Sequence, residues 1–184
     1  MVLAAAVPAH ATSFTLDSFE VTAHGADPGL VLIERDLLTH PYTFSLNHVG
    51  DSTPEFNLFR LRTTETATNL DDLIPYPITV DFSFSAPSPG FDGDAVGITG
   101  SLLAIGDFGY AFWDNPYTMA FGSSGLLGVS LSNEVFSLPG GANISAQFTL
   151  LRADTAAPIP EPASILLVGS GLAAAFRARR RRHV

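Results

Sequence analysis

The stretch 78–85 reads Ile-Thr-Val-Asp-Phe-Ser-Phe-Ser and alternates apolar with polar side chains without a break. Successive side chains of a β-strand point to opposite faces, so this alternation predicts a strand with one buried face and one face in water. Residues 144–150, Ile-Ser-Ala-Gln-Phe-Thr-Leu, repeat the pattern. A period of two, rather than the 3.6 of a helix, therefore organises the chain and indicates β structure.

Shorter apolar runs surround these two predicted strands, and turn-forming sequences such as 27–29 (Asp-Pro-Gly) and 139–141 (Pro-Gly-Gly) separate them. Many short strands at this spacing are typical of an antiparallel sandwich. We therefore predict an all-β fold for residues 12–152, an antiparallel β-sandwich of the jelly-roll or Ig-like kind. Only residues 66–73 suggest a helical turn or a long loop. The shorter predicted strands are 14–21, 30–34, 42–47, 56–62, 96–103, 110–113, 118–121, 127–132 and 135–138.

The predicted domain and its linker, residues 12–162, are strongly acidic. They contain all 18 acidic residues of the chain against four arginines and no lysine, which gives a net charge of −14. Such a surface repels nucleic acid and anionic head groups, so we expect no nucleic-acid partner. The chain has no cysteine, which excludes disulfides, thiolate metal sites and a cysteine nucleophile. Divalent cations and basic partners are the natural complements of this charge.

The C-terminal segment has a different pattern. A Pro-rich linker at 153–162 leads into an apolar run at 163–176. Clustered arginines stay on the cytoplasmic side of a membrane, so residues 163–184 are predicted to form a transmembrane helix with an Arg-rich cytoplasmic end. At about 1.5 Å per residue, the apolar run reaches only about 21 Å across a hydrocarbon core of about 30 Å, which favours a transient anchor. The arginines are Arg177, Arg179, Arg180, Arg181 and Arg182.

This tail resembles the PEP-CTERM sorting signal over residues 158–184. The matching features are the triplet Pro160-Glu161-Pro162, the adjoining apolar run and the arginine cluster, in this order. The resemblance implies recognition by an exosortase, a membrane-embedded cysteine transpeptidase that cuts near the triplet and releases or re-anchors its substrate. It therefore implies a substrate of processing and not an enzyme. A buried C-terminal helix of a soluble domain, followed by a basic tail, is the alternative interpretation.

The N-terminal residues 1–11, Met-Val-Leu-Ala-Ala-Ala-Val-Pro-Ala-His-Ala, read as the late part of a secretory signal peptide. An apolar stretch that ends in the small residues Ala9 and Ala11 is typical of a cleavage site, which we predict after Ala11. No Lys or Arg precedes Arg35, so Met1 is expected to lie inside a longer leader. A disordered Ala-rich terminus is the alternative interpretation.

Few residues of the predicted domain suggest metal chemistry. Asp92-Gly93-Asp94 and Asp71-Asp72 offer hard oxygen ligands for Ca²⁺, which takes six to eight of them. Neither stretch has the full calcium-loop pattern, and solvated turn carboxylates are the favoured interpretation of both. Asp92 and Asp94 are the candidate metal ligands, and no other cofactor is expected.

The remaining candidates are a histidine pair, a serine-rich stretch and the single tryptophan. His40 and His48 could share a hairpin, but an exposed or structural role is favoured over metal ligation. Gly-Ser-Ser-Gly at 122–125 lacks the spacing of a nucleophile elbow, and no histidine follows it in the domain, so it is predicted to be a turn. Trp113 could stack on a carbohydrate, but the 14 phenylalanines of this small chain favour a place in an aromatic core.

Together these patterns predict an exported structural protein of the cell surface or extracellular matrix, associated with exopolysaccharide or biofilm, that an exosortase sorts and cleaves. The expected partners are the exosortase, the membrane during anchoring, and exopolysaccharide. The chain is expected first as an inner-membrane-anchored intermediate and then at the cell surface or outside the cell. The alternatives are a calcium-assisted carbohydrate-binding module and, less favoured, a secreted hydrolase, because no catalytic constellation is visible.

Overall fold

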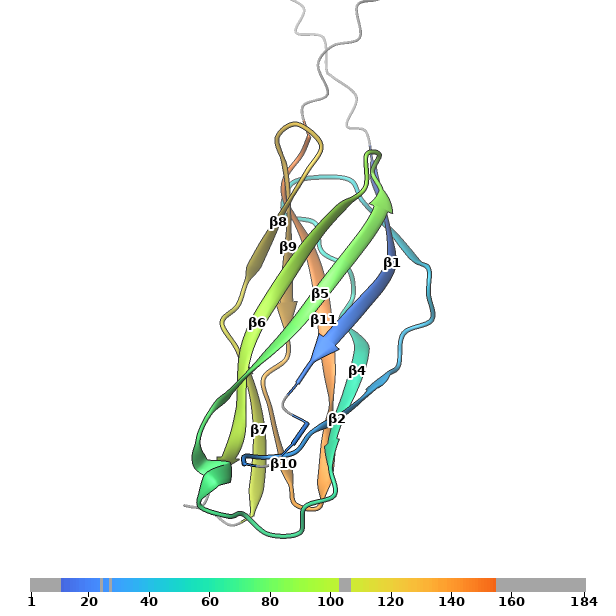
Figure 1. Cartoon of the computed structure of the whole chain (residues 1–184). Coiled ribbons are helices and arrows are strands. Elements are labelled where there is room, and N and C mark those ends of the chain that lie inside the picture. The colour runs from blue at the N-terminus through green and yellow to red at the C-terminus, as the bar shows by residue number, and fades with distance from the viewer. Residues whose placement is uncertain (1–10, 24, 27, 103–106, 155–184) are drawn as a thin grey trace, which may run out of the picture. The chain divides into compact units, whose positions relative to one another are not determined.

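Eleven strands and one short 3₁₀ helix form the described part of the chain, residues 11–23, 25–26, 28–102 and 107–154 of a computed structural model (Figure 1). The 3₁₀ helix η1 spans Asp71–Leu73 and falls in the stretch expected to form a helical turn or loop. The predicted all-β class is confirmed. The strands are β1 (Thr12–Thr22), β2 (Ile33–Asp36), β3 (Tyr42–Leu46), β4 (Phe56–Thr63), β5 (Tyr76–Ala86), β6 (Phe91–Leu102), β7 (Phe108–Trp113), β8 (Tyr117–Phe121), β9 (Gly125–Leu131), β10 (Glu134–Ser137) and β11 (Gly140–Arg152).

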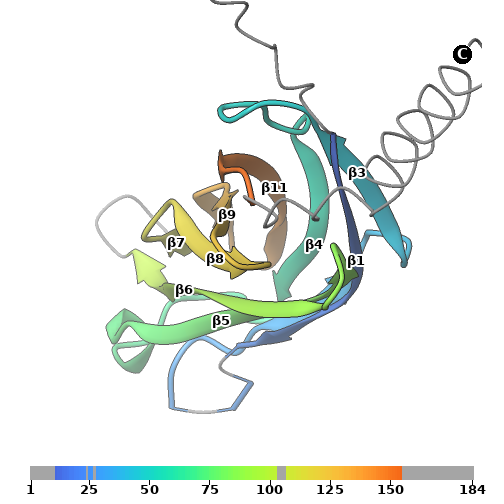
Figure 2. The ribbon, with the colours of Figure 1, turned by 90° about the horizontal axis from the view of Figure 1, so that it is seen from above.

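The strands form two antiparallel sheets. Sheet A has the order β10-β7-β6-β5-β1-β3, and sheet B has the order β2-β4-β11-β9-β8. Both sheets curl, and in the view from above β5 and β6 of sheet A face β9 and β11 of sheet B (Figure 2). The predicted antiparallel pairing is therefore confirmed, whereas the jelly-roll or Ig-like type stays a prediction.

The two strands with the clearest alternation lie inside the sheets and not at their edges. The stretch 78–85 falls in β5, between β6 and β1, and the stretch 144–150 falls in β11, between β4 and β9. Their apolar side chains are buried, and the polar side chains between them are more exposed. A shift of one residue in pairing would turn the whole buried set toward water, so the alternation also sets the register.

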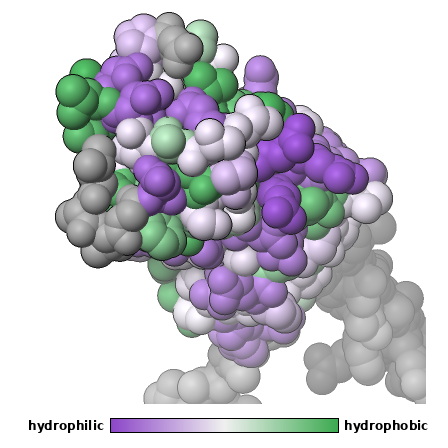
Figure 3. All heavy atoms as spheres, turned by 90° about the horizontal axis from the view of Figure 1, so that it is seen from below, coloured by the Kyte–Doolittle hydropathy of each residue, from purple (hydrophilic) through white to green (hydrophobic). Residues whose placement is uncertain are grey.

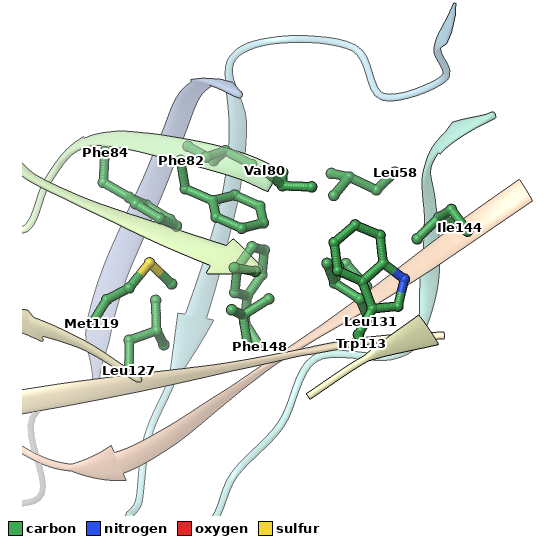
Figure 4. Packing of buried hydrophobic residues seen from close by; sticks show 14 of the residues in the cluster. Leu58, Val80, Phe82, Phe84, Trp113, Met119, Leu127, Leu131, Ile144 and Phe148 are labelled. Carbon is green, nitrogen blue, oxygen red and sulfur yellow. The ribbon is translucent and has the colours of Figure 1, made fainter. Parts of the chain in front are cut away.

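The core between the sheets is rich in aromatic rings. Phe148 of β11 stacks on Phe44 of β3 with ring centroids 5.0 Å apart, and it meets Phe82 and Phe84 of β5 edge-on at 5.9 and 5.7 Å. These β5 rings and Phe148 point toward one another across the core (Figure 4). Each fully buried ring contributes roughly 1.5–3 kcal/mol. Because the rings come from both sheets, they hold the sheets together.

Trp113 is part of this core. Its side chain is 5% exposed, and its ring meets the ring of Phe59 edge-on at 6.3 Å. The packing interpretation of this tryptophan is confirmed. Among the described residues, the core cluster draws on positions from 14 to 150, and the compact unit that contains it ends at Asp154. The domain therefore has a core of its own, and we expect it to fold without residues 155–184.

The strand predicted at 30–34 is wrong in its position, since the observed strand runs from residue 33 to residue 36. Leu30 and Leu32 come before it and fill a small second cluster with Phe136 and Leu138. Their apolar character reflects packing in this cluster and not the alternation of a strand.

The strand predicted at 96–103 starts earlier than expected, at Phe91. Phe91 is the register partner of Phe84 and stacks on its ring with centroids 4.6 Å apart, so β6 follows β5 to the end of the hairpin. Asp92 and Asp94 consequently lie in a strand. The expectation that they belong to a turn is wrong.

The predicted tail lies outside the described residues, as do residues 1–10 of the predicted signal peptide. β11 ends at Arg152, and Asp154 is the last residue described. Over the ranges given above, the structure contains no helix with the length and apolar content needed to cross a membrane. The hydrophobic helix predicted at 163–184 falls beyond those ranges.

Candidate functional site

The outer face of sheet A carries a row of carboxylates. Glu20 of β1 is the register partner of Asp81 of β5, which is in turn the partner of Asp94 of β6. All three residues are exposed, and together with Asp92 they line an open groove. We term these four residues the acidic face. Like charges directly opposite one another destabilise a sheet, so the acidic face lowers the stability of the domain.

Both calcium candidates, Asp92 and Asp94, belong to the acidic face. Gly93 between them faces inward, where a Cβ atom would collide with Met119 of β8. Among the described residues, no three His, Cys, Asp or Glu side chains are grouped so that they could hold a metal ion. Calcium also takes ligands from water and backbone carbonyls, so its binding by Asp92 and Asp94 stays a prediction.

Asp71 and Asp72 have structural partners. Asp72 is 1% exposed and accepts a hydrogen bond of 2.7 Å from the backbone N–H of Asn69. Asp71 accepts a hydrogen bond of 3.2 Å from the backbone N–H of Gly29 and thereby ties η1 to the loop before β2. Their interpretation as solvated turn carboxylates is wrong, because both stabilise local backbone.

His40 and His48 lie on either side of β3 and do not share a hairpin turn. A ring nitrogen of His40 lies 3.6 Å from a carboxylate oxygen of Asp36, and the corresponding distance from His48 to Asp51 is 3.5 Å. The backbone N–H of His48 and that of Asn47 each donate to Asp51 at 2.9 Å. These two bonds, with His48 contributing more, lower the pKa of the Asp51 carboxyl. The structure thus gives each histidine a carboxylate neighbour of its own.

Four residues from two separate segments hold the end of the folded domain, and the sequence did not link these segments. Asp154 accepts hydrogen bonds from the hydroxyl of Ser123 at 2.8 Å, from its backbone N–H at 3.0 Å, and from the backbone N–H of Ser124 at 3.0 Å. The Ser123 hydroxyl contributes most to the lowered pKa of Asp154. Arg152 donates from Nε to the carbonyl of Ser124. We term Ser123, Ser124, Arg152 and Asp154 the exit clamp.

The exit clamp uses the Gly-Ser-Ser-Gly stretch at 122–125, which forms the turn between β8 and β9 as predicted. Gly122 has φ +58°, in the left-handed region that favours glycine, and a Cβ atom there would collide with the Asp154 carboxylate. Ser123 and Asp154 are 31 residues apart in sequence. No local pattern links them, which is why sequence reasoning missed the clamp.

A small apolar patch lies beside the acidic face. Val96 and Ile98 follow Asp94 on the exposed side of β6, and Phe112 of β7 is the register partner of Ile98. Their exposures are 40%, 45% and 38%, and Phe112 stacks on Tyr110 with ring centroids 4.9 Å apart. In the view from below, hydrophobic residues lie among hydrophilic ones on the domain surface (Figure 3). The exposed aromatic ring is therefore Phe112 and not the neighbouring tryptophan.

Of the predicted processing sites, only Ala11 lies in the described part of the chain. It is exposed and directly precedes β1, so the predicted cleavage after Ala11 would leave this strand complete. Ala9, the triplet at 160–162 and the arginines of the tail fall outside the described residues.

A comparison with protein families finds the PEP-CTERM protein-sorting motif at residues 158–182. The chain carries a PEP-CTERM sorting motif. No curated protein and no solved structure matches the chain. The motif indicates an exosortase-targeted, exported surface protein that is processed at a membrane before its release to the cell surface. The resemblance seen in the triplet, the apolar run and the arginines is confirmed.

The PEP-CTERM motif begins shortly after the exit clamp in the sequence. Only residues 155–157 separate Asp154 from the first matched residue, Pro158.

Proposed function

We propose that this chain is a structural protein of the cell surface or extracellular matrix, delivered there by an exosortase that cuts near the triplet Pro160-Glu161-Pro162. The observation that carries the proposal is the sorting motif at 158–182, which follows closely on a domain with its own core. The motif accounts for export and processing, and the domain is the part of the chain that is delivered. The structural role and the association with exopolysaccharide are proposals about this domain.

The outer face of sheet B supports association with polysaccharide. The polar residues of β11 that alternate with its buried side chains carry amide and hydroxyl groups: Asn143, Ser145, Gln147 and Thr149. Residues on one face of a strand recur about every 7 Å. Gln147 Nε2 donates to the Thr53 carbonyl and the Thr149 hydroxyl pairs with that of Ser52, so the row offers its remaining amide and hydroxyl atoms to an extended chain of sugars.

The finer fold assignment belongs to the same proposal. We infer that the two sheets form a β-sandwich of the jelly-roll or Ig-like kind, because one core cluster draws residues from both of them. We also infer that the apolar segment 163–176 crosses the membrane as a helix until cleavage, with its arginines on the cytoplasmic side.

The delivery step is tested by expressing the full chain together with an exosortase and separating membrane, surface and medium fractions. The wild-type domain is expected outside the membrane fraction. Glu161→Ala should leave it in the membrane fraction, because the triplet is altered. Glu55→Ala makes the same change at an exposed position before β4 and should behave as the wild type. Equal distributions for Glu161→Ala and the wild type would refute delivery by this route.

A calcium-assisted carbohydrate-binding module is the second candidate. The exposed, stacked ring of Phe112 lies on the same side of sheet A as the acidic face, with Val96 and Ile98 between them, and an aromatic ring on one face with carboxylates suits a sugar with a bridging cation. Glycan arrays with calcium, and with sodium chloride at matched ionic strength, test this. Binding should be lost in Phe112→Ala but kept in Leu70→Ala, which shortens an exposed apolar side chain just before η1. Asp92→Asn with Asp94→Asn should remove the calcium dependence of binding. Binding equal in sodium and calcium would exclude the calcium role.

A further inference from the structure

Three arginines lie together on the outer face of sheet B. Arg60 and Arg62 are two residues apart on β4, and Arg35 of β2 is the register partner of Arg60. All three are exposed, and they line an open groove with Ile33 and Glu34. Neighbours on one face of a strand are about 7 Å apart, and register partners about 5 Å apart. We term Arg35, Arg60 and Arg62 the arginine patch.

No carboxylate of the described residues is in ion-pair contact with the arginine patch. Among the described residues, none of its three guanidinium groups forms an ion pair, and Asp36 lies against His40 instead. The strands β4, β8, β9 and β11 contain no carboxylate at all. Two like charges face each other at Arg35 and Arg60, which destabilises the isolated domain. An anionic surface bound there would relieve that repulsion.

The acidic face repeats the arrangement of the arginine patch with the opposite sign. Asp92 and Asp94 are two residues apart on β6, and Asp81 of β5 is the register partner of Asp94. Each set therefore has two charges along one strand and a third across from one of them, and the acidic face adds Glu20 across from Asp81. The two sets lie on the outer faces of different sheets, which enclose the shared core between them.

We propose that the arginine patch binds the acidic face of a second copy of this chain, so that copies join head to tail. A second copy has the charges that the arginine patch requires, since each domain carries both a basic surface and an acidic surface. Two different surfaces meet in such a contact, so copies add one after another and keep one free half at each end unless the chain closes into a ring. The inference rests on the proposed structural role and gives that role a mechanism of assembly.

The net charge of the domain limits the strength of this contact. Like-charged domains repel at long range, but this repulsion is screened beyond about 8 Å at physiological ionic strength and beyond about 3 Å in 1 M salt. Assembly is therefore expected at physiological salt and high local concentration, which a crowded cell surface provides, and it should be lost in 1 M sodium chloride.

The test uses residues 12–154, which contain the whole core, in analytical ultracentrifugation over a series of protein concentrations. The wild type should associate as its concentration rises. Arg60→Glu with Arg62→Glu should stay monomeric, and so should Asp81→Arg with Asp94→Arg. Glu55→Arg reverses a charge away from both faces and should associate as the wild type does. Circular dichroism checks the fold of each variant. If Arg60→Glu with Arg62→Glu does not fold, Arg60→Gln with Arg62→Gln is used in its place and should also stay monomeric.

The deciding sample is an equimolar mixture of the two charge-reversed double variants. The arginine variant keeps the unchanged acidic face and the aspartate variant keeps the unchanged arginine patch, so the mixture should associate although each variant alone does not. Both variants keep a net negative charge, so general attraction cannot explain a recovery. A mixture that stays monomeric, or double variants that associate like the wild type, would overturn the proposal.

A polysaccharide ligand is the other outcome for the arginine patch. If the wild type stays monomeric but binds polygalacturonate, and Arg60→Glu with Arg62→Glu abolishes that binding, then the partner is an acidic glycan and not a second copy. Neither result depends on an exosortase, because the experiment uses the separate domain. Failure of self-association thus leaves the delivery test unaffected.

Discussion

Sheet A and sheet B bury the same kinds of side chain between them but differ in the charges that their strands carry. The strands of sheet B carry all four arginines of the described residues against only Glu34 and Asp36. Burial dictates every second residue of a strand and leaves the residues between them free. The difference between the sheets therefore shows which positions the fold determines and which are open to surface function. The strands of sheet A carry no arginine and six carboxylates, at Asp17, Glu20, Asp81, Asp92, Asp94 and Glu134.

The largest effect is expected where the two sheets meet. Phe148→Ala should lower the free energy of unfolding by about 3–5 kcal/mol, because it removes a fully buried ring that contacts rings of the opposite sheet. Phe112→Ala makes the same change on the outer face of sheet A and should cost less than about 1 kcal/mol. Urea denaturation of both variants measures the difference. Equal losses of unfolding free energy in the two variants would contradict the assignment of Phe148 to the core and of Phe112 to the outer face.

A smaller effect separates hydrogen-bonded from unbonded carboxylates. Asp154 has a lowered pKa through its bonds to Ser123 and Ser124, so its contribution to stability is present above the usual pKa of 3.8 and is lost as the pH falls through the lower folded value. Asp154→Asn should therefore melt below the wild type at pH 7, and this gap should narrow as the pH falls below 3.8 toward pH 2. Thermal denaturation between pH 7 and pH 2 measures the gap.

The matched control for Asp154 is Asp92→Asn on sheet A. Among the described residues, the Asp92 side chain has no hydrogen-bond partner, and its main chain bonds only in the strand pairing. Asp92→Asn should therefore not lower the melting temperature at pH 7. A gap for Asp154→Asn that stays constant over the whole pH range would contradict the account of the exit clamp.

The smallest effect concerns repulsion on the acidic face. Asp81 lies between Glu20 and Asp94 across three strands, so Asp81→Asn should raise the free energy of unfolding by a few tenths of a kcal/mol in dilute protein. The gain should disappear in 1 M sodium chloride, where screening acts within about 3 Å. Asp114→Asn, in the turn between β7 and β8, should show no gain at either salt concentration. Denaturant unfolding at the two ionic strengths measures this gain. A gain in stability that persists at high salt would contradict the repulsion and point to a packing effect.

The core of the fold could be predicted because its signal is local. The alternation at 78–85 and at 144–150 predicted strands β5 and β11, and both lie at the centre of their sheets. The start of β6 could not be predicted in the same way, because Asp-Gly-Asp at 92–94 has the composition of a turn. Its place in a strand depends on pairing with β5, which composition does not reveal.

The functional features likewise divide into one that is contiguous in sequence and others that join distant residues. The sorting motif is contiguous in sequence, so its triplet, apolar run and arginines could be found without a structure. The arginine patch and the exit clamp each join residues from separate segments, such as Arg35 with Arg60 and Ser123 with Asp154. Only the strand register and the turn between β8 and β9 bring these residues together.

The most direct test of the central claim is the intact mass of the exported protein, produced with an exosortase and measured by mass spectrometry. The claim is that the tail is a removable sorting signal on an independently folding domain. The mature product is then expected to lack residues 177–184 and to keep the domain through Asp154. An exported product that still carries Arg177 to Val184 would contradict it.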